Sequence, residues 1–279
     1  MDLSSEYPPK KLYKYVPTER VSILQDLKIR FTPADEYNDP FEVVPRMAVF
    51  TDDDVRTMAR DFVHGQYVMH VSDGGKLSIK EFEKQFPSLE GKNLSELRDW
   101  INQYSEEEAP RQTKSFNSKN FGSLCLCEER DNLLMWAHYA DSHRGLVIEF
   151  DGMHPFFTNS RRTARIKYQE ERPIYNVNLG NFADTLLCKS VEWCYEKEWR
   201  TFAQFKELDP PILKGNKRIH LAKLPPESLI SVTLGCQSSD STCQQIKAAL
   251  ENNSLRHVIV EKAQMETDRF GLRFVKIDL

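Results

Sequence analysis

The chain changes twice between two kinds of hydrophobic periodicity, and this pattern limits the folds that it can adopt. Apolar and polar residues alternate in short segments on both sides of residues 53–108, as in β-strands that are buried on one face. Within residues 53–108, apolar residues recur at helical spacing, as at Val55, Met58 and Phe62. This irregular mixture predicts an α+β fold with a mixed, largely antiparallel central sheet and flanking helices, rather than a doubly wound sheet.

The periodic segments and the turn residues between them place the individual elements. We expect helices at residues 19–26, 131–139, 182–195 and 239–251. We expect strands at residues 11–16, 28–32, 123–127, 145–150, 165–168, 199–205, 218–221, 231–234, 257–261 and 272–277. Residues 1–279 are predicted to form one domain, with a helical insertion or lid at residues 53–110. A helical layer that covers one face of the sheet fits the same pattern.

Charge and hydropathy limit the partners of the chain. It has 38 basic and 42 acidic residues and a formal charge of −4, which argues against a non-specific nucleic-acid binder but leaves a local basic groove open. No apolar run is long enough to span a bilayer, and the first residues lack the pattern of a signal peptide. We therefore expect a cytoplasmic protein without a membrane partner. Its six cysteines are interpreted as reduced thiols.

The chain lacks several familiar sequence motifs, and this disfavours the chemistries that depend on them. The chain has no GxxxxGK[ST] loop, GxGxxG turn, GxSxG elbow or HExxH pair, which disfavours nucleoside triphosphate hydrolysis, a Rossmann dinucleotide site and serine hydrolase chemistry. It also has neither a CxxC nor an HxxxH pair, so we expect no bound metal.

The segment from Glu196 to Arg200 is the strongest site candidate. It lies where a predicted helix gives way to a strand, so extended geometry would place Glu196, Glu198 and Arg200 on one face, and Lys197 and Trp199 on the other. Two close carboxylates can differ in pKa and divide acid–base and charge-stabilising work between them. A strand in which Arg200 only neutralises a glutamate is the alternative.

A short predicted helix, opened by Asp131 and Asn132, carries a second cluster. Trp136 and Tyr139 are three residues apart and share a face, whereas His138 points elsewhere. The pair can serve as core or as a platform for a ring, and His138 can be structural or catalytic.

A third cluster, from Asn38 to Glu42, follows a strand in a loop with two prolines. Loops carried on rigid strands often hold functional residues, so Asn38 and Asp39 are candidates for ligand binding. Asp39 before Pro40 can equally mark only the start of the next element.

With these clusters in place, the chain resembles a bacterial family catalogued as domain of unknown function 2971. Four ordered motifs carry the resemblance and span most of the chain from about residue 11 to residue 205. They are Leu12-Tyr13-Lys14-Tyr15, Phe31 with Asn38-Asp39-Pro40-Phe41-Glu42, residues 132–140 with Gly145 and Glu149-Phe150-Asp151, and Lys189 with Trp193 and residues 195–200.

The order of elements also resembles that of the NAD-dependent ADP-ribosyltransferases. In that superfamily, a first strand, a middle strand with the following helix, and a late Glu-x-Glu build the site. Tyr13-Lys14-Tyr15, Cys125-Leu126-Cys127 with Trp136 and Tyr139, and Glu196-Lys197-Glu198 would take these positions. The first strand lacks the Arg or His of the superfamily, and Cys-Leu-Cys replaces its hydroxyl residues.

The second resemblance implies an activity with NAD as substrate. Glu198 would contact the nicotinamide ribose and stabilise positive charge as nicotinamide leaves. Trp136 or Tyr139 would stack on the nicotinamide ring, and Lys14 or Arg200 would meet the pyrophosphate. The implied protein modifies a macromolecule, as a toxin or phage-defence effector does.

Two other functions stay open at this stage. One is a nuclease or phosphodiesterase with a divalent metal on Asp39, Glu42, His138 and Glu198. The other is a non-catalytic module whose aromatic clusters bind a protein or a nucleotide. The sequence sets neither the acceptor nor the oligomeric state.

Overall fold

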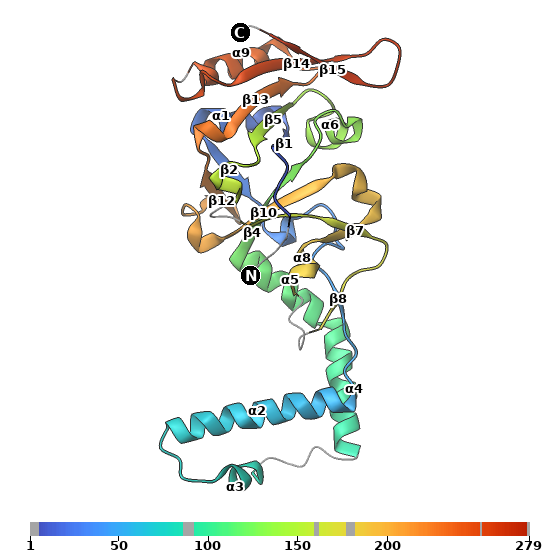
Figure 1. Cartoon of the computed structure of the whole chain (residues 1–279), viewed down its shortest axis with the longest axis vertical. Coiled ribbons are helices and arrows are strands. Elements are labelled where there is room, and N and C mark those ends of the chain that lie inside the picture. Colours follow the sequence, from blue (N-terminus) through green and yellow to red (C-terminus); the bar gives the residue numbers. More distant parts are fainter. Residues whose placement is uncertain (1–5, 86–91, 159–161, 177–181, 252, 278–279) are drawn as a thin grey trace.

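The computed structural model describes residues 6–85, 92–158, 162–176, 182–251 and 253–277. Its centre is an eight-stranded sheet with the strand order β15-β14-β13-β5-β1-β4-β10-β6 (Figure 1). Only β13 and β14 run parallel in this sheet, and the other neighbours are antiparallel. The eight strands are β1 (Lys11–Val16), β4 (Phe121–Cys127), β5 (Leu146–Asp151), β6 (Arg162–Arg165), β10 (Glu198–Gln204), β13 (Leu229–Leu234), β14 (Ile259–Met265) and β15 (Leu272–Lys276). The predicted α+β class with a mixed, largely antiparallel sheet is confirmed.

Smaller sheets and short helices surround this centre. A three-stranded antiparallel sheet has the order β11 (Ile212–Lys214), β12 (Lys217–Lys223) and β2 (Lys28–Phe31). Two parallel pairs join β3 (Arg46–Met47) to β8 (Ile174–Tyr175) and β7 (Lys167–Gln169) to β9 (Cys188–Ser190). The short helices around the sheets are α1 (Ser22–Asp26), α6 (Leu133–Tyr139), α7 (Pro155–Thr158), α8 (Phe182–Leu186) and α9 (Asp240–Leu250).

The central sheet has an apolar core on each face. The side chains of its strands alternate between the two faces, so one strand can contribute to both cores. On β1, Leu12 and Val16 enter a large apolar core, whereas Tyr13 and Tyr15 enter a smaller core that α6 covers. The large core also contains residues of α1, α7 and α9. The site described below adjoins the smaller core.

The segment predicted as a helical insertion forms an arm. Helices α2 (Asp52–Ser72), α3 (Ile79–Glu83) and α4 (Lys92–Glu107) extend away from the sheets, and α5 (Ala109–Asn120) leads back to β4 (Figure 1). Helices α2 and α4 therefore do not form a layer on the central sheet. Part of the predicted segment, residues 86–91, lies outside the described residues.

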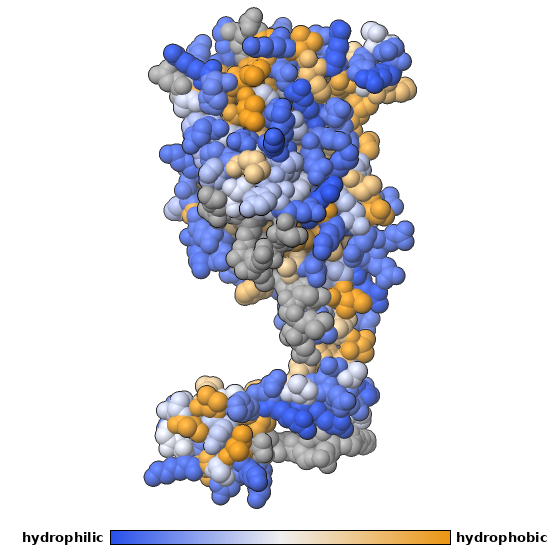
Figure 2. All heavy atoms as spheres, in the orientation of Figure 1, coloured by the Kyte–Doolittle hydropathy of each residue, from blue (hydrophilic) through white to orange (hydrophobic). Residues whose placement is uncertain are grey.

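The arm has a small core and several exposed apolar side chains. Phe50, Val55 and Leu94 are buried together. Figure 2 shows apolar patches among polar atoms at the free end of the arm. Exposed apolar side chains of the arm include Phe62, Val68, Met69, Val71, Trp100 and Tyr104. Among the described helices, none is long and apolar enough to cross a membrane.

Two predicted elements are wrong. The strand predicted at residues 165–168 spans the end of β6 and most of β7, which belong to different sheets. Residues 182–195 are not a single helix, because α8 ends at Leu186 and is followed by β9 and by a 3₁₀ helix, η3 (Val191–Glu196). Strand β9 pairs in register with β7, and its Lys189 is buried. Tertiary pairing and the burial of this lysine override the helical propensity of the segment.

Candidate functional site

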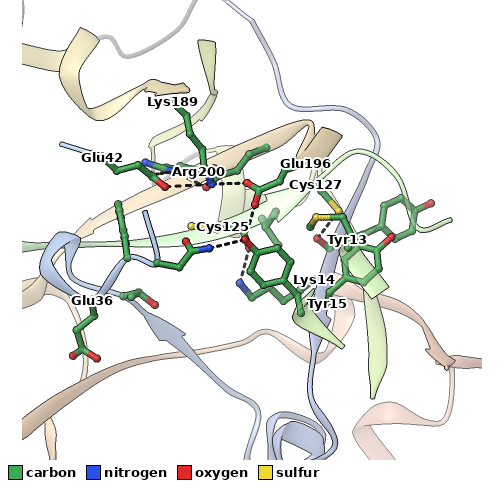
Figure 3. Close-up of a pocket in the computed structure, with 17 residues that line it drawn as sticks. Tyr13, Lys14, Tyr15, Glu36, Glu42, Cys125, Cys127, Lys189, Glu196 and Arg200 are labelled. Carbon is green, nitrogen blue, oxygen red and sulfur yellow. Dashed lines mark hydrogen bonds and ion pairs between the residues drawn. The ribbon is translucent and has the colours of Figure 1, made fainter. Parts of the chain in front are cut away.

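A pocket of about 240 Å³ opens where β1, β4 and β10 lie side by side, between the loop after β2 and helix α6 (Figure 3). Most of its lining side chains are polar or aromatic. They are Tyr13, Lys14, Tyr15, Thr32, Glu36, Tyr37, Asn38, Glu42, Cys125, Leu126, Cys127, Met135, Tyr139, Lys189, Glu196, Glu198 and Arg200. Segments that are almost two hundred residues apart in the sequence thus share one cavity.

Strand register explains how three of these segments meet. Cys127 on β4 lies opposite Tyr13 on β1 and opposite Glu198 on β10. Cross-strand partners project to the same face of an antiparallel sheet, so these three side chains form a row across three strands. Two residues further along β10, Arg200 lies opposite Cys125 and extends the same face.

A buried ion-pair network forms the floor of the pocket, and Lys189 is at its centre. Its Nζ lies 2.6 Å from Oε2 of Glu196, 3.2 Å from Oε1 of Glu42 and 3.5 Å from Oε2 of Glu198. Each of these four side chains is at most 5% exposed. One ammonium group therefore joins three carboxylates from two segments, the loop that carries Glu42 and the Glu-x-Glu segment; Figure 3 labels Lys189 between Glu42 and Glu196.

Arg200 is the second cation of the network. Its Nε donates to Oε1 of Glu198 at 2.6 Å and its Nη2 to Oε2 at 2.9 Å, so the pair is bidentate. Nη2 also donates to Glu42, and the guanidinium lies 4.8 Å from the ring centre of Tyr37. Two cations thus neutralise most of the charge of three buried carboxylates.

The Glu-x-Glu segment reaches this arrangement by a different backbone path from the one predicted. Glu196 ends the 3₁₀ helix η3, and Lys197 adopts a left-handed conformation with a φ of 45° before β10 begins at Glu198. The two carboxylates still converge on Lys189, although not through a continuous extended strand. Lys197 turns outward to Glu129, and Trp199 packs in the large core on the opposite face, as predicted.

The two carboxylates have pKa values that are shifted in opposite directions. Burial raises the pKa of Glu196, and the nearby charge of Glu198 adds to the effect. Burial would also raise the pKa of Glu198, but Arg200 and Lys189 outweigh it and lower this pKa to about 2. A pair with separated pKa values is the arrangement that acid–base sites use to assign different roles to like groups.

Tyr139 connects this network to the open part of the pocket. Its hydroxyl donates to Oε1 of Glu196 at 2.6 Å and accepts from Nδ2 of Asn38 at 3.0 Å. Burial raises the pKa of Tyr139, as does the neighbouring Glu196, so the hydroxyl stays protonated and can donate. Lys14 donates to the carbonyl of Cys125 at 2.8 Å on another wall of the pocket.

The pocket also contains two buried thiols. Burial raises the pKa of Cys125 to about 12 and that of Cys127 to about 12. Such thiols are protonated at neutral pH and are poor nucleophiles. All six cysteines lie in the described residues and are free.

Three of the predicted site residues do not line this pocket. Trp136 is fully buried, donates to the carbonyl of Arg130 at 2.8 Å and contacts the rings of Tyr15 and His143. His138 is exposed, and among the described residues its ring lies near the rings of Tyr139 and Tyr195. The stacking role expected for Trp136 and the catalytic role expected for His138 therefore have no geometric basis in this pocket.

Asp39 is the third. It is 4% exposed and accepts from the backbone N–H of Phe41 at 2.9 Å, which stabilises the local turn. It lines a second pocket of about 310 Å³, which lies on the other side of Glu42 and Lys189. Glu42 and Glu198 thus meet around Lys189 and Arg200 without His138, and the described residues contain no group of three or more His, Cys, Asp or Glu side chains placed to hold a metal ion.

Lys189 is the pocket residue that the sequence pattern does not predict. It belongs to a family motif, but the pattern predicts a helix at residues 182–195 and gives Lys189 no role in the site. Tyr37 also lines the cavity without having been predicted there, whereas Cys125 belongs to the strand that the superfamily resemblance assigned to the site. A signal was present in Cys188-Lys189-Ser190, where a charged residue stands between small ones in a chain rich in nearby glutamates.

The fold and the site define an α+β protein with a polar pocket above a buried ion-pair network. Residues 135–201, which run from α6 into β10, match the family described as "Protein of unknown function (DUF2971)". The match covers less than half of the chain and supports the family resemblance that its motifs carry. No curated protein and no solved structure matches the chain.

Proposed function

We propose that this protein is a cytoplasmic ADP-ribosyltransferase that transfers ADP-ribose from NAD to a macromolecule, as a bacterial toxin or phage-defence effector. The supporting observation is that residues from three distant segments line the same pocket. Tyr13, Cys127 and Glu198, from the three positions that the superfamily resemblance assigns, lie in one row across neighbouring strands and line one pocket.

The size of the pocket indicates which part of NAD it would hold. Pockets for whole drug-sized ligands are roughly 300–1,000 Å³, and this one is about 240 Å³. It therefore accommodates the nicotinamide and part of its ribose, with the remainder of the dinucleotide across the opening. Tyr139 supplies the aromatic ring for the nicotinamide, and Lys14 is placed to meet a phosphate.

The carboxylates would act when the bond between nicotinamide and ribose breaks. The bonding electron pair leaves with the nicotinamide nitrogen, and positive charge develops on the ribose ring. Ionised Glu198 would stabilise this charge through its field, because both of its oxygens already accept hydrogen bonds from Arg200. Glu196 is the carboxylate that connects to the pocket through Tyr139.

The second half of the transfer requires a base. A hydroxyl or amine of the acceptor forms the new bond to the ribose carbon and loses a proton. Glu196 is proposed to take this proton, since its pKa is raised above the ordinary value. Tyr139 and Lys189 hold its two oxygens in place.

The test is incubation with labelled NAD and cell lysate, following nicotinamide release and label transfer. We expect Glu196→Gln and Glu198→Gln to lose both products, and Glu192→Gln, an exposed glutamate of the same 3₁₀ helix, to match wild type. Thermal unfolding of each variant distinguishes loss of chemistry from loss of fold. Tyr139→Phe, a milder change, should reduce release without unfolding the protein. If wild type yields neither product, or if all four variants retain both, the proposal is wrong.

A further inference from the structure

The three-stranded sheet β11-β12-β2 has an outward face that is rich in cations. In this sheet Lys214 lies opposite Lys217, Leu221 opposite Arg30, and Lys223 opposite Lys28. Cross-strand partners share a face, and residues two apart on β12 share it too. One face therefore carries the following eight side chains: Lys28, Arg30, Ile212, Lys214, Lys217, Ile219, Leu221 and Lys223.

Burial shows that this face points outward. On β12, His220 and Ala222 are buried, whereas Lys217 and Lys223 are exposed. Strand β2 alternates in the same way, with Ile29 and Phe31 in the core. The outward set defined above is called the basic face.

The cations of the basic face are only partly neutralised. Glu36 pairs with Arg30 at 2.9 Å and with Lys217 at 3.2 Å, and Asp209 pairs with Lys28 at 3.1 Å. Lys214 and Lys223 make no ion pair with any of the described residues. Five cations against two carboxylates is a local excess of positive charge on a chain whose formal charge is −4.

The basic face adjoins the pocket. Glu36, which holds Arg30 and Lys217, also lines the pocket, as does Thr32 at the end of β2. Thr32 bridges to Ser123 of β4, so the small sheet is joined to the central one at this edge. A ligand that lies along the basic face reaches the opening beside Glu36.

We propose that the basic face binds single-stranded nucleic acid. Phosphates would meet Lys214, Lys217 and Lys223, since β12 spans about 20 Å at 3.3 Å per residue and so faces several nucleotides. The aliphatic side chains between the cations provide no base-specific hydrogen bonds, so binding should depend little on sequence.

The pocket explains why the strand should be single. A cavity of about 240 Å³ is too small for a base pair, and enzymes that act on a base need that base outside the stack. That the bound strand is also the acceptor of ADP-ribose rests on the proposed function. The binding itself does not.

Fluorescence anisotropy with labelled single-stranded DNA and RNA of about 20 nucleotides tests the binding without NAD. The variant is the triple Lys214→Gln, Lys217→Gln, Lys223→Gln. The matched control is the triple Lys76→Gln, Lys80→Gln, Lys84→Gln, which removes the same charge from exposed positions on the arm.

We expect wild type and the arm control to bind alike. The basic-face variant should lose about 100-fold in affinity at 0.1 M salt, with a salt slope shallower by about 2. Equal binding by both triples, or no saturable binding by wild type, overturns the inference. So does binding of phosphatidylserine vesicles or an acidic peptide in preference to either nucleic acid.

Label transfer to the same oligonucleotides then tests the acceptor role. Label on the strand, lost in the basic-face variant while nicotinamide release persists, supports it. Binding without label on the strand, in a protein that releases nicotinamide and labels lysate protein, overturns the acceptor role alone. Absence of nicotinamide release under all conditions counts against the proposed function and leaves the binding result intact.

Discussion

The pocket floor and the arm use the same ion-pair chemistry in opposite environments. At the floor, Lys189 and Arg200 hold three glutamates, and every member is buried. On the arm, Arg56 pairs with Asp53 at 2.9 Å, and the two side chains are 43% and 90% exposed. Water screens the second pair but not the first, so removing one partner should have very different consequences.

The two regions also differ in whether their ion pairs are needed for stability. A buried polar network is costly to assemble, and a hydrophobic replacement of the whole network is often no less stable. Its presence beside a cavity, with two carboxylates of separated pKa, is consistent with the chemistry proposed above. The arm pair needs no such explanation.

The largest effect is expected for Arg200→Met. This change leaves Glu198 and Glu42 buried with Lys189 as the remaining cation. Uncompensated buried charge of this kind destabilises a protein by about 3–5 kcal/mol. Urea unfolding at neutral pH measures the loss, and a loss below about 1 kcal/mol would mean that the network relaxes or admits water.

Acid unfolding should show the next largest effect. The folded pKa of Glu198 is about 2, below its ordinary 4.5, so its contribution is complete above pH 4.5 and is lost as the pH falls toward 2. The contribution is on the order of 3 kcal/mol at 1.36 kcal/mol per unit. Glu196 has the opposite sign, because its raised pKa favours the folded state at low pH and loses that contribution as pH rises.

This contribution of Glu198 can be measured by comparing the unfolding free energies of wild type and Glu198→Gln across this pH range. The difference between the two proteins should shrink as the pH falls from about 4.5 toward 2. A constant difference would contradict the assigned pKa of Glu198.

A smaller effect is expected for Tyr139→Phe. The change removes the hydrogen bonds to Glu196 and from Asn38 while keeping the ring. Loss of such a bond costs about 1 kcal/mol, or somewhat more because the acceptor is charged. Tyr195→Phe is the control, since the hydroxyl of Tyr195 has no hydrogen bond among the described residues. Equal losses in the two variants would remove Tyr139 from the network.

The smallest effect is expected for Arg56→Gln on the arm. An exposed pair three residues apart on a helix contributes about 0.5 kcal/mol or less, and salt should reduce it further. Thermal unfolding at low and high salt measures it. A loss comparable to that of Arg200→Met would remove the contrast between the two regions.

Local patterns predicted most of the elements because the periodicity of a strand or helix depends only on residues that are close together in the sequence. The segments at 11–16, 123–127 and 145–150 form strands within one or two residues of their predicted bounds, and the capped helices at 131–139 and 239–251 do the same. The failure at 182–195 has a different cause. The placement of Lys189 depends on carboxylates from Glu42 and Glu198, which local propensity does not contain.

The sequence by itself determined the α+β class, the family motifs and the face of β10 that carries Glu198 and Arg200. Those properties depend on spacing along the chain and on side-chain alternation. Tertiary structure decided which clusters meet, because strand order places β1, β4 and β10 together and Lys189 requires three carboxylates around it. It also placed Trp136 in the core and the basic face beside the pocket, since both depend on pairings between distant segments.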